Sequence, residues 1–513
     1  MKKATRFLYV LALIKFILPF LIQSAYYQPH RDEFLYLAEA KHPAWGFMEV
    51  PPLLSVFAMI TNAFGGGMFW IKFWPSLFGA FTYIITGRII LSLGGKYFAL
   101  ILAFLGFVTG AYMRVHYLFQ PNFLEIFFWT MIAYAVISYT QTEKTKWLYV
   151  LGVSIGLGLM SKYSVAFFTF SLALAVLFTK QKTIFLNKHL YYALGIAFII
   201  CVPNILWQVN HNYPLMYHMQ LLQDEQLQYL SSTGFLTDQL LMSFPSIFVW
   251  VAGLCFTGFM RGGKPYRFIA LGYLFVIILL LILHGKGYYA LGAYPVLFAF
   301  GAYQLEQFSK GRNIAWRLAL IIIPAFLGYR IMSLLLPFKM PENLAAFFVK
   351  KKVEKLGVLK WEDQQNHPLP QDYADMLGWK EISQKVANAY HSLPKEEQAQ
   401  TMIYSGQYAF AGAVNYYAKE LQLPEIYSHN ASFLLWMPDK YNCKNIILIQ
   451  HDIPSPTNPI DGKFKEVIVL DSLNMPLARE NGVKVILLHN GPAEVNDLIA
   501  QKIGNEKSRF IKK

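Results

Sequence analysis

The sequence predicts a polytopic α-helical membrane protein with a smaller α/β domain at its C-terminal end. Of its 513 residues, 55% are hydrophobic and only 15% are charged, whereas soluble domains carry about 25% charged residues. The hydrophobic residues form blocks of about 17 to 25, the length that crosses a bilayer. This composition excludes a soluble or disordered chain, and three cysteines are too few for a disulfide-built fold.

The charge distribution separates the two parts. Residues 1–344 hold 25 Lys and Arg against 11 Asp and Glu, whereas residues 345–513 hold 20 against 19. Excess base beside membrane spans is typical of cytoplasmic loops. The charge therefore needs no polyanion to explain it, and we expect membrane lipids but no nucleic acid as partners.

We predict about eleven transmembrane helices. The first follows Lys2, Lys3 and Arg6 and has no small-residue cleavage site after it, so it is predicted to be a retained signal anchor. The fifth and sixth are short and could form one broken helix. The predicted spans are 7–25, 68–91, 97–113, 123–140, 147–160, 163–179, 190–208, 244–260, 268–284, 288–306 and 315–337.

The loops predict the orientation. With the N-terminus in the cytoplasm, sixteen Lys and Arg lie at inner ends and loops and six at outer ones, as the positive-inside rule requires. An odd number of spans places the C-terminal domain on the outer side of the inner membrane, which is the periplasm in a Gram-negative cell. Eight acidic residues also fall outside and only two inside, which orientation does not explain. The outer loops, 26–67, 114–122, 209–243 and 284–288, are therefore where we expect the chemistry.

Residues 345–513 are predicted to form the α/β domain, because short apolar strands alternate with helices and turn residues. The expected strands are Ile446–Ile449, Val467–Leu470 and Val483–Leu488, and the expected helices are 379–393, 409–421 and 493–503.

The first outer loop carries an acidic pair, Asp32 and Glu33, shortly after the first span. A carboxylate at the water–lipid boundary could serve as the general base for an acceptor hydroxyl. A solvated loop whose acids keep it outside would show the same pattern.

The second outer loop places Glu125 within the first turn of an apolar helix. An ionisable group at that depth is a functional candidate, although an acid there could simply complement the helix dipole. Arg114 and His116 in the same loop are candidate partners of Glu125.

The loop before the tenth span reads HGKGYYALGAYP. Lys286 lies between two glycines, which let the backbone bend close to a ligand, and Tyr288 and Tyr289 follow. Lys and Tyr donors suit a lipid-linked phosphate, but they also suit an interfacial anchor with a snorkelling lysine. Lys162 has the same two interpretations. The sequence has no Walker A motif for ATP-driven transport and no zinc spacing.

Taken together, the segments RDEFLYLAEA, QPNFLEIFFW, GLGLMSKYS, PNILWQVNHNYP and GKGYYALGAYPVLFAFGAYQLE resemble glycosyltransferase family 39. This family comprises bacterial relatives of protein O-mannosyltransferases and of the lipid A aminoarabinose transferase, and it has the GT-C fold. The resemblance covers nearly the whole chain. It implies transfer of one sugar from a polyprenyl-phosphate donor to an envelope lipid, glycan or protein.

The resemblance maps the family's key carboxylate onto Asp32, with Glu33 beside it, and a second one onto Glu125. Many relatives have Asp two or three residues after the proline, where this chain has Asn122 and Phe123. No cofactor is required, although Mg²⁺ or Mn²⁺ bridging Asp32 and Glu125 is an open alternative. The groups expected to stabilise the leaving phosphate are Lys286, Tyr288, Tyr289, Lys162, Arg31 and Lys72.

Two other functions remain open on the sequence. A polymerase or ligase would move larger lipid-linked glycans through similar loops. A secondary transporter would place its charges near the bilayer midplane and often show an internal repeat. Here the candidate charges cluster at outer helix ends, which favours the transferase.

Overall fold

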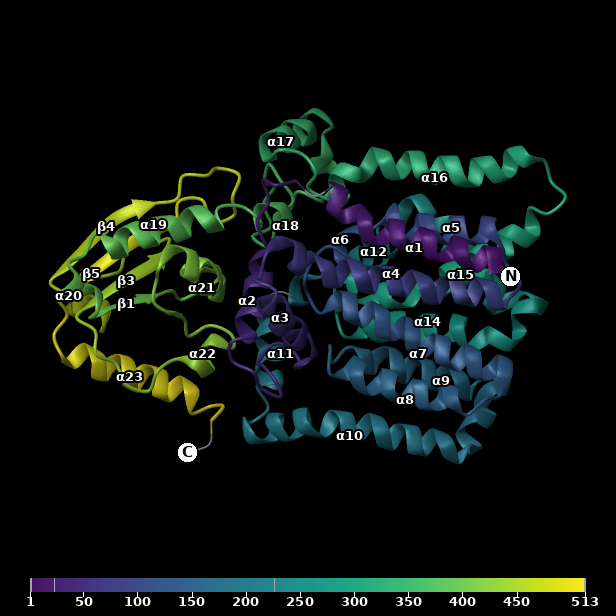
Figure 1. The fold of residues 1–513 in the computed structure, drawn as a ribbon, viewed down its shortest axis with the longest axis horizontal. Helices are drawn as coiled ribbons and strands as arrows, with labels where there is room; N and C mark the ends of the chain where they lie inside the picture. The colour runs from purple at the N-terminus through teal and green to yellow at the C-terminus, as the bar shows by residue number, and fades with distance from the viewer. Residues whose placement is uncertain (1, 23, 226, 512–513) are drawn as a thin grey trace.

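The computed structural model describes residues 2–22, 24–225 and 227–511. Figure 1 shows long helices running side by side and an α/β domain at one end of this bundle. Three short helices lie between the two parts, α2 (Arg31–Glu39), α3 (Leu53–Ala63) and α11 (Pro214–Glu225). The N-terminus lies at the bundle end remote from the α/β domain.

A helix is present at each of the eleven predicted places. Several are shorter than predicted, because 3-10 turns or breaks interrupt them. Their bounds are α1 Lys2–Ile22, α4 Met68–Ser92, α5 Tyr97–Val108, α7 Asn122–Thr142, α8 Lys146–Leu159, α9 Val165–Leu177, α10 Lys188–Asn210, α13 Ile247–Phe259, α14 Arg267–Ile282, α15 Tyr294–Phe308 and α16 Ile314–Leu335. The shorter α6 (Tyr112–Val115) and α12 (Ser232–Leu241) join them.

The number of membrane spans is not confirmed as eleven. Within the described ranges, six helices are long and apolar enough to cross a bilayer, and up to eight if each of two bent pairs is one span. Helices α5 and α8 are apolar but shorter, at 12 and 14 residues. About 20 residues are needed for a full crossing, so these two helices fall short by length.

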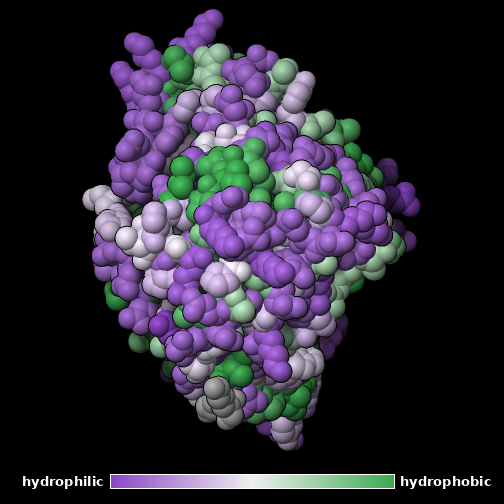
Figure 2. All heavy atoms as spheres, turned by 90° about the vertical axis from the view of Figure 1, so that its left-hand side faces the viewer, coloured by the Kyte–Doolittle hydropathy of each residue, from purple (hydrophilic) through white to green (hydrophobic). Residues whose placement is uncertain are grey.

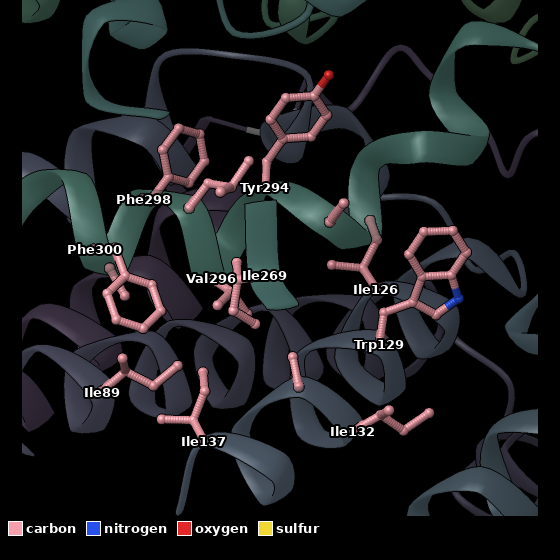
Figure 3. Close-up of a cluster of buried hydrophobic side chains, with 14 of the residues drawn as sticks. Ile89, Ile126, Trp129, Ile132, Ile137, Ile269, Tyr294, Val296, Phe298 and Phe300 are labelled. Atoms are coloured by element: carbon pink, nitrogen blue, oxygen red, sulfur yellow. The ribbon is translucent and has the colours of Figure 1, made fainter. Parts of the chain in front are cut away.

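The bundle core is built around α15, which is buried on nearly all sides. Figure 3 shows Tyr294, Val296, Phe298 and Phe300 of this helix among large apolar side chains that include Trp129 of α7. α13 packs closely against α15, because a Cβ added at Gly301 would lie 1.7 Å from the Val249 carbonyl oxygen. Small residues at such crossings are the usual device for packing membrane helices.

The C-terminal domain contains a five-stranded mixed sheet in the order β2-β1-β3-β5-β4. The first three are parallel neighbours, whereas β5 is antiparallel to β3 and β4. The predicted strands correspond to β3 (Asn445–Gln450), β4 (Glu466–Ser472) and β5 (Lys484–His489). β1 (Thr401–Tyr404) and β2 (Ile426–Tyr427) were not predicted. Strands of four and two residues are too short to show a clear alternation of apolar and polar residues.

Helices cover this sheet. The three predicted ones are α19 (Trp379–His391), α21 (Tyr408–Leu421) and α23 (Glu494–Lys507). The remaining short helices are α17 Pro341–Lys350, α18 Gln371–Ala374, α20 Lys395–Gln398 and α22 Phe433–Trp436. The predicted domain boundary at 344 falls inside α17, whose Leu344 and Phe348 pack with the C-terminal core.

The outer face of the domain is mainly hydrophilic (Figure 2). One hydrophobic patch lies at the height where Figure 1 places β4. β4 is an edge strand, and its Val467, Ile468 and Val469 are about two-fifths exposed.

The domain is packed firmly onto α2. One hydrophobic cluster contains Phe34 and Leu35 of α2, Tyr117 of the second predicted outer loop, and Phe410 of α21. The backbones approach closely, since a Cβ at Gly412 would lie 3.0 Å from Phe34. The helix that carries the acidic pair is thus held by both parts of the protein.

Candidate active site at the junction of bundle and C-terminal domain

The acidic pair is positioned by the first turn of α2. His30 is the N-cap, and its Nδ1 accepts a hydrogen bond from the Asp32 amide at 3.2 Å. The Glu33 carboxylate accepts from the His30 amide at 2.7 Å, which completes a capping box. The segment HRDE therefore begins a helix for local reasons, and its two carboxylates leave the turn in different directions.

Glu33 is directed into the protein. Its carboxylate and the Lys72 ammonium are both 0% exposed, and Lys72 Nζ lies 2.6 and 2.7 Å from the two carboxylate oxygens. The Phe119 amide also donates to Glu33 at 2.5 Å, and Lys72 lies 4.2 Å from the centre of the Tyr117 ring. The pair thereby joins α2, α4 and the second outer loop. This burial argues for a structural role rather than the predicted catalytic and phosphate-binding roles of Glu33 and Lys72.

Asp32 faces the junction, with 31% of its side chain exposed. Tyr408 of α21 donates to Oδ1 at 2.7 Å, and Gln120 donates to Oδ2 at 3.1 Å. Burial acts to raise the pKa of Asp32, but His30, Arg31 and the Tyr408 hydrogen bond outweigh it and keep the pKa below its ordinary range. Asp32 is therefore a carboxylate that stays ionised.

Sequence reasoning missed both hydrogen-bond donors to Asp32. Tyr408 lies 376 positions away in the C-terminal domain, and no local pattern points to it. Gln120 stands directly before Pro121 in the second-loop motif, so its place in QPNFLE was the available signal.

The second predicted carboxylate belongs to an ion pair. Lys162 Nζ lies 2.7 Å from Glu125 Oε2 and also donates to Asn122 Oδ1 at 2.7 Å, and Ser164 donates to Glu125 Oε1. The prediction that Arg114 and His116 would be the partners of Glu125 is wrong. Arg114 instead pairs with Asp372 of the C-terminal domain at 2.8 Å, because the second outer loop turns towards that domain.

The predicted phosphate-binding residues come together in part. Lys162 lies 4.6 Å from the centre of the Tyr289 ring and 5.7 Å from that of Tyr288. Tyr288 and Tyr289 belong to a 3-10 helix, η5 (Gly287–Ala293), and Lys286 directly precedes it. Lys286 interacts electrostatically with Asp32 and Lys162. Burial lowers the pKa of Lys286 despite nearby carboxylates. Lys162, Lys286 and Asp32 therefore belong to one electrostatic cluster at the junction.

The two glycines beside Lys286 do not both serve a ligand. A Cβ at Gly287 would lie 2.4 Å from Asp238 Oδ2, so the close backbone approach there is to α12. Gly285 instead lines a cavity.

This cavity has a volume of about 630 Å³ and is predominantly apolar. Phe167 and Leu280 line it from the bundle, Met216 lines it from α11, and Gly285 and Tyr289 line it beside Lys286. Tyr289 lines this cavity and its ring centre lies 4.6 Å from Lys162 Nζ, so the cavity reaches close to that cationic side chain.

The two carboxylates give a bridging metal little support. Asp32 and Glu125 each already accept hydrogen bonds from protein donors, and the described ranges contain no group of three or more His, Cys, Asp or Glu that could hold a metal ion. That no cofactor is required stays a prediction, and a bridging Mg²⁺ or Mn²⁺ stays the open alternative.

The chain is similar to proteins of known structure over nearly its whole length. Crystal structures of ArnT from Cupriavidus metallidurans, in the apo state and bound to undecaprenyl phosphate, align with TM-scores of 0.61 and 0.62. Sequence identity is 12% and 11%, over 95% of this chain and 98% of the other. Residues 49–207 match the family described as dolichyl-phosphate-mannose-protein mannosyltransferase. The chain therefore has the GT-C fold of these ArnT structures, and residues 49–207 resemble the mannosyltransferase family in sequence.

A curated relative is consistent with this assignment. The lipid A galacturonosyltransferase RgtD of Rhizobium johnstonii is 21% identical over 197 residues, which are 37% of this chain. The match spans 40% of that relative's length. The family 39 resemblance and the GT-C fold predicted from the sequence are thus confirmed. The range matched to the mannosyltransferase family contains Glu125 and Lys162 but neither Asp32 nor Lys286.

Proposed function

We propose that this protein is a membrane glycosyltransferase that moves a single sugar from a polyprenyl-phosphate donor to an envelope lipid, glycan or protein. The observation that carries the proposal is the ionised carboxylate of Asp32 in one cluster with Lys162 and Lys286, beside an apolar cavity. That combination offers an apolar site for the lipid chain of the donor, cations for its phosphate and a carboxylate for the acceptor hydroxyl. A complex of ArnT with undecaprenyl phosphate supports the choice of lipid.

In this proposal the apolar cavity receives the part of the lipid next to the phosphate. Lys286 and Lys162 neutralise the phosphate, and Tyr288 and Tyr289 surround Lys162. Charge builds up on the phosphate as it leaves, so fixed cations stabilise the transition state more than the ground state. Glu125 holds Lys162 in place through the ion pair.

The reaction is a single in-line displacement with inversion at the anomeric carbon. The acceptor hydroxyl oxygen forms a bond to this carbon while the bond to the phosphate oxygen breaks. The bonding electrons leave with the polyprenyl phosphate. Asp32 orients the acceptor hydroxyl and takes its proton. Because the pKa of Asp32 is low, it is a weak base, and orientation is its larger contribution.

The charge asymmetry supports the proposed cell location. The N-terminus lies at the bundle end remote from the C-terminal domain (Figure 1). The excess of basic residues at that end favours a cytoplasmic N-terminus. The site and the C-terminal domain would then lie outside the cytoplasm, at the outer face of the bacterial inner membrane.

The test compares purified wild type with Asp32→Asn and with Asp497→Asn, an exposed control on α23. Each is mixed with short polyprenyl-phosphate monosaccharides and an envelope lipid extract, and free polyprenyl phosphate is measured by mass spectrometry. We expect release by wild type and the control, and at least a hundredfold slower release by a folded Asp32→Asn. Equal release by all three would contradict the role of Asp32. Release only from oligosaccharide donors would favour transfer of larger glycans.

A further inference from the structure

A second cavity lies where the C-terminal domain meets the start of α2. Its volume is about 420 Å³, and its lining is polar. Arg31 contributes from α2, Trp361, Glu362 and His367 from the segment before α18, and Gln407 and Arg479 from the rest of the domain. The volume falls within the range of small-molecule sites, roughly 300–1,000 Å³.

The walls of this cavity are held by interactions within the protein. The indole of Trp361 stacks on His367 with ring centres 3.6 Å apart, and its Nε1 donates to the Leu369 carbonyl at 2.8 Å. Arg479 bridges Asp375 at 3.2 Å and Glu362 at 3.0 Å. A site fixed in this way loses little entropy when a ligand binds.

Arg31 connects the cavity to the catalytic carboxylate. Its Nε lies 4.0 Å from Asp32 Oδ1, too far for a hydrogen bond. Within the described residues this buried Nε has no hydrogen-bond partner. The protein therefore does not complete the hydrogen bonding of a guanidinium that lines the cavity, and such a group is costly to leave unsatisfied.

The cavity also adjoins the proposed reaction centre along the chain. Arg31 and Gln407, which line it, immediately precede Asp32 and Tyr408, whose side chains are hydrogen-bonded at 2.7 Å. Burial lowers the pKa of Lys286, and among the nearby carboxylates Glu362 raises that pKa most strongly. Both cavities therefore lie near Lys286. The apolar cavity is lined there by Gly285 and Tyr289, and the polar cavity by Glu362.

From this arrangement we propose that the polar cavity binds the sugar end of the acceptor, a hydroxyl-rich saccharide of low net charge. The inference rests on the proposed function and deepens it. Two arginines, Arg31 and Arg479, stand against three carboxylates in the lining, those of Glu362, Asp363 and Glu480. Such mixed donors and acceptors suit hydroxyl groups, whereas a polyanion would be repelled by the three carboxylates. The indole offers a flat apolar surface for a pyranose ring.

The same arrangement gives the C-terminal domain a role. It supplies most of the acceptor site and also the Tyr408 hydroxyl that orients Asp32. The domain thereby links recognition of the acceptor to the state of the carboxylate that receives its proton.

The kinetic test uses the full-length protein with Gln407→Ala and Trp361→Phe as cavity variants. Gln384→Ala, exposed on α19, is the matched control. Polyprenyl phosphate release is followed while the acceptor is varied, either as intact envelope lipid extract or as its water-soluble saccharides. We expect the apparent KM for acceptor to rise about five- to tenfold in the cavity variants, with kcat and the donor KM unchanged. If the water-soluble saccharides support release as well as the extract does, the acceptor is a soluble glycan. If release requires the intact extract, the acceptor is a glycolipid.

A binding measurement separates failure of this inference from failure of the proposed function. Saturation-transfer NMR with methyl β-glucoside and methyl glucuronide needs no donor and no turnover. We expect a signal for the neutral glucoside with wild type and Gln384→Ala, weakened in both cavity variants. Unchanged acceptor kinetics in the cavity variants, or equal glucoside signals in all four proteins, would overturn the acceptor site. Absence of donor turnover in wild type would instead contradict the proposed function.

Discussion

The buried Glu33–Lys72 pair gives a sharp test of which first-loop carboxylate is structural. In Glu33→Gln, the fully buried Lys72 keeps its charge but loses its counter-ion, and one amide oxygen must replace two carboxylate oxygens that accept from Lys72, His30 and Phe119. Removing one partner of a buried ion pair typically costs about 3–5 kcal/mol. We expect a loss of this size for Glu33→Gln and for Lys72→Met.

The double variant Glu33→Gln/Lys72→Met should recover most of that loss. With both charges gone, no ion is buried without a partner, and the amide oxygen still accepts from a backbone amide. We expect the double variant to lie within about 1–2 kcal/mol of wild type. The assay is unfolding in detergent micelles, by heat and by denaturant, with donor turnover measured on the same preparations. Asp497→Asn, exposed on α23, is the control, and it should unfold like wild type.

If Glu33 and Lys72 are structural, their variants should lose activity only as far as they lose stability. Turnover should follow stability across the three pair variants and return in the double variant. A Lys72→Met protein with wild-type stability and no turnover would refute the reasoning and place Lys72 in the phosphate site. Simple additivity of the two single losses would refute the ion-pair explanation.

Three further outcomes are expected. Tyr408→Phe removes a hydrogen bond that lowers the pKa of Asp32, so the acidic limb of the kcat/KM profile should move to higher pH; an unmoved limb would argue against this contact. Lys286→Gln should lower kcat/KM for the donor about a hundredfold, and an effect on the acceptor KM alone would contradict its phosphate role. Burial raises the pKa of Asp375 to about 6 despite His30 and Arg479, so stability from this group is full below about pH 4 and is lost as the pH rises through 6. Asp375→Asn should remove that part of the pH dependence, as unfolding midpoints between pH 4 and 7 would show.

The sequence by itself determined the class of the protein and where its chemistry should be sought. Apolar blocks and basic loops are local properties, because a bilayer selects each span by its own length and hydropathy. For this reason a helix is found at each of the eleven predicted places, although six to eight of the described spans are long and apolar enough to cross a bilayer. Three of the five strands were predicted from short apolar runs between turn residues. The same local information located Asp32, Glu125, Lys162 and Lys286, since loop position and motif order need no partner.

Only the tertiary structure decided what each of these side chains does. Asp32 and Glu33 are neighbours in the chain, yet one faces the junction and the other is buried against Lys72. Tyr408 reaches Asp32 across 376 residues because α21 packs on α2. The state of a carboxylate depends on the donors and charges around it, and packing between distant segments places those groups. The length and hydropathy of a segment do not specify which distant segment it packs against.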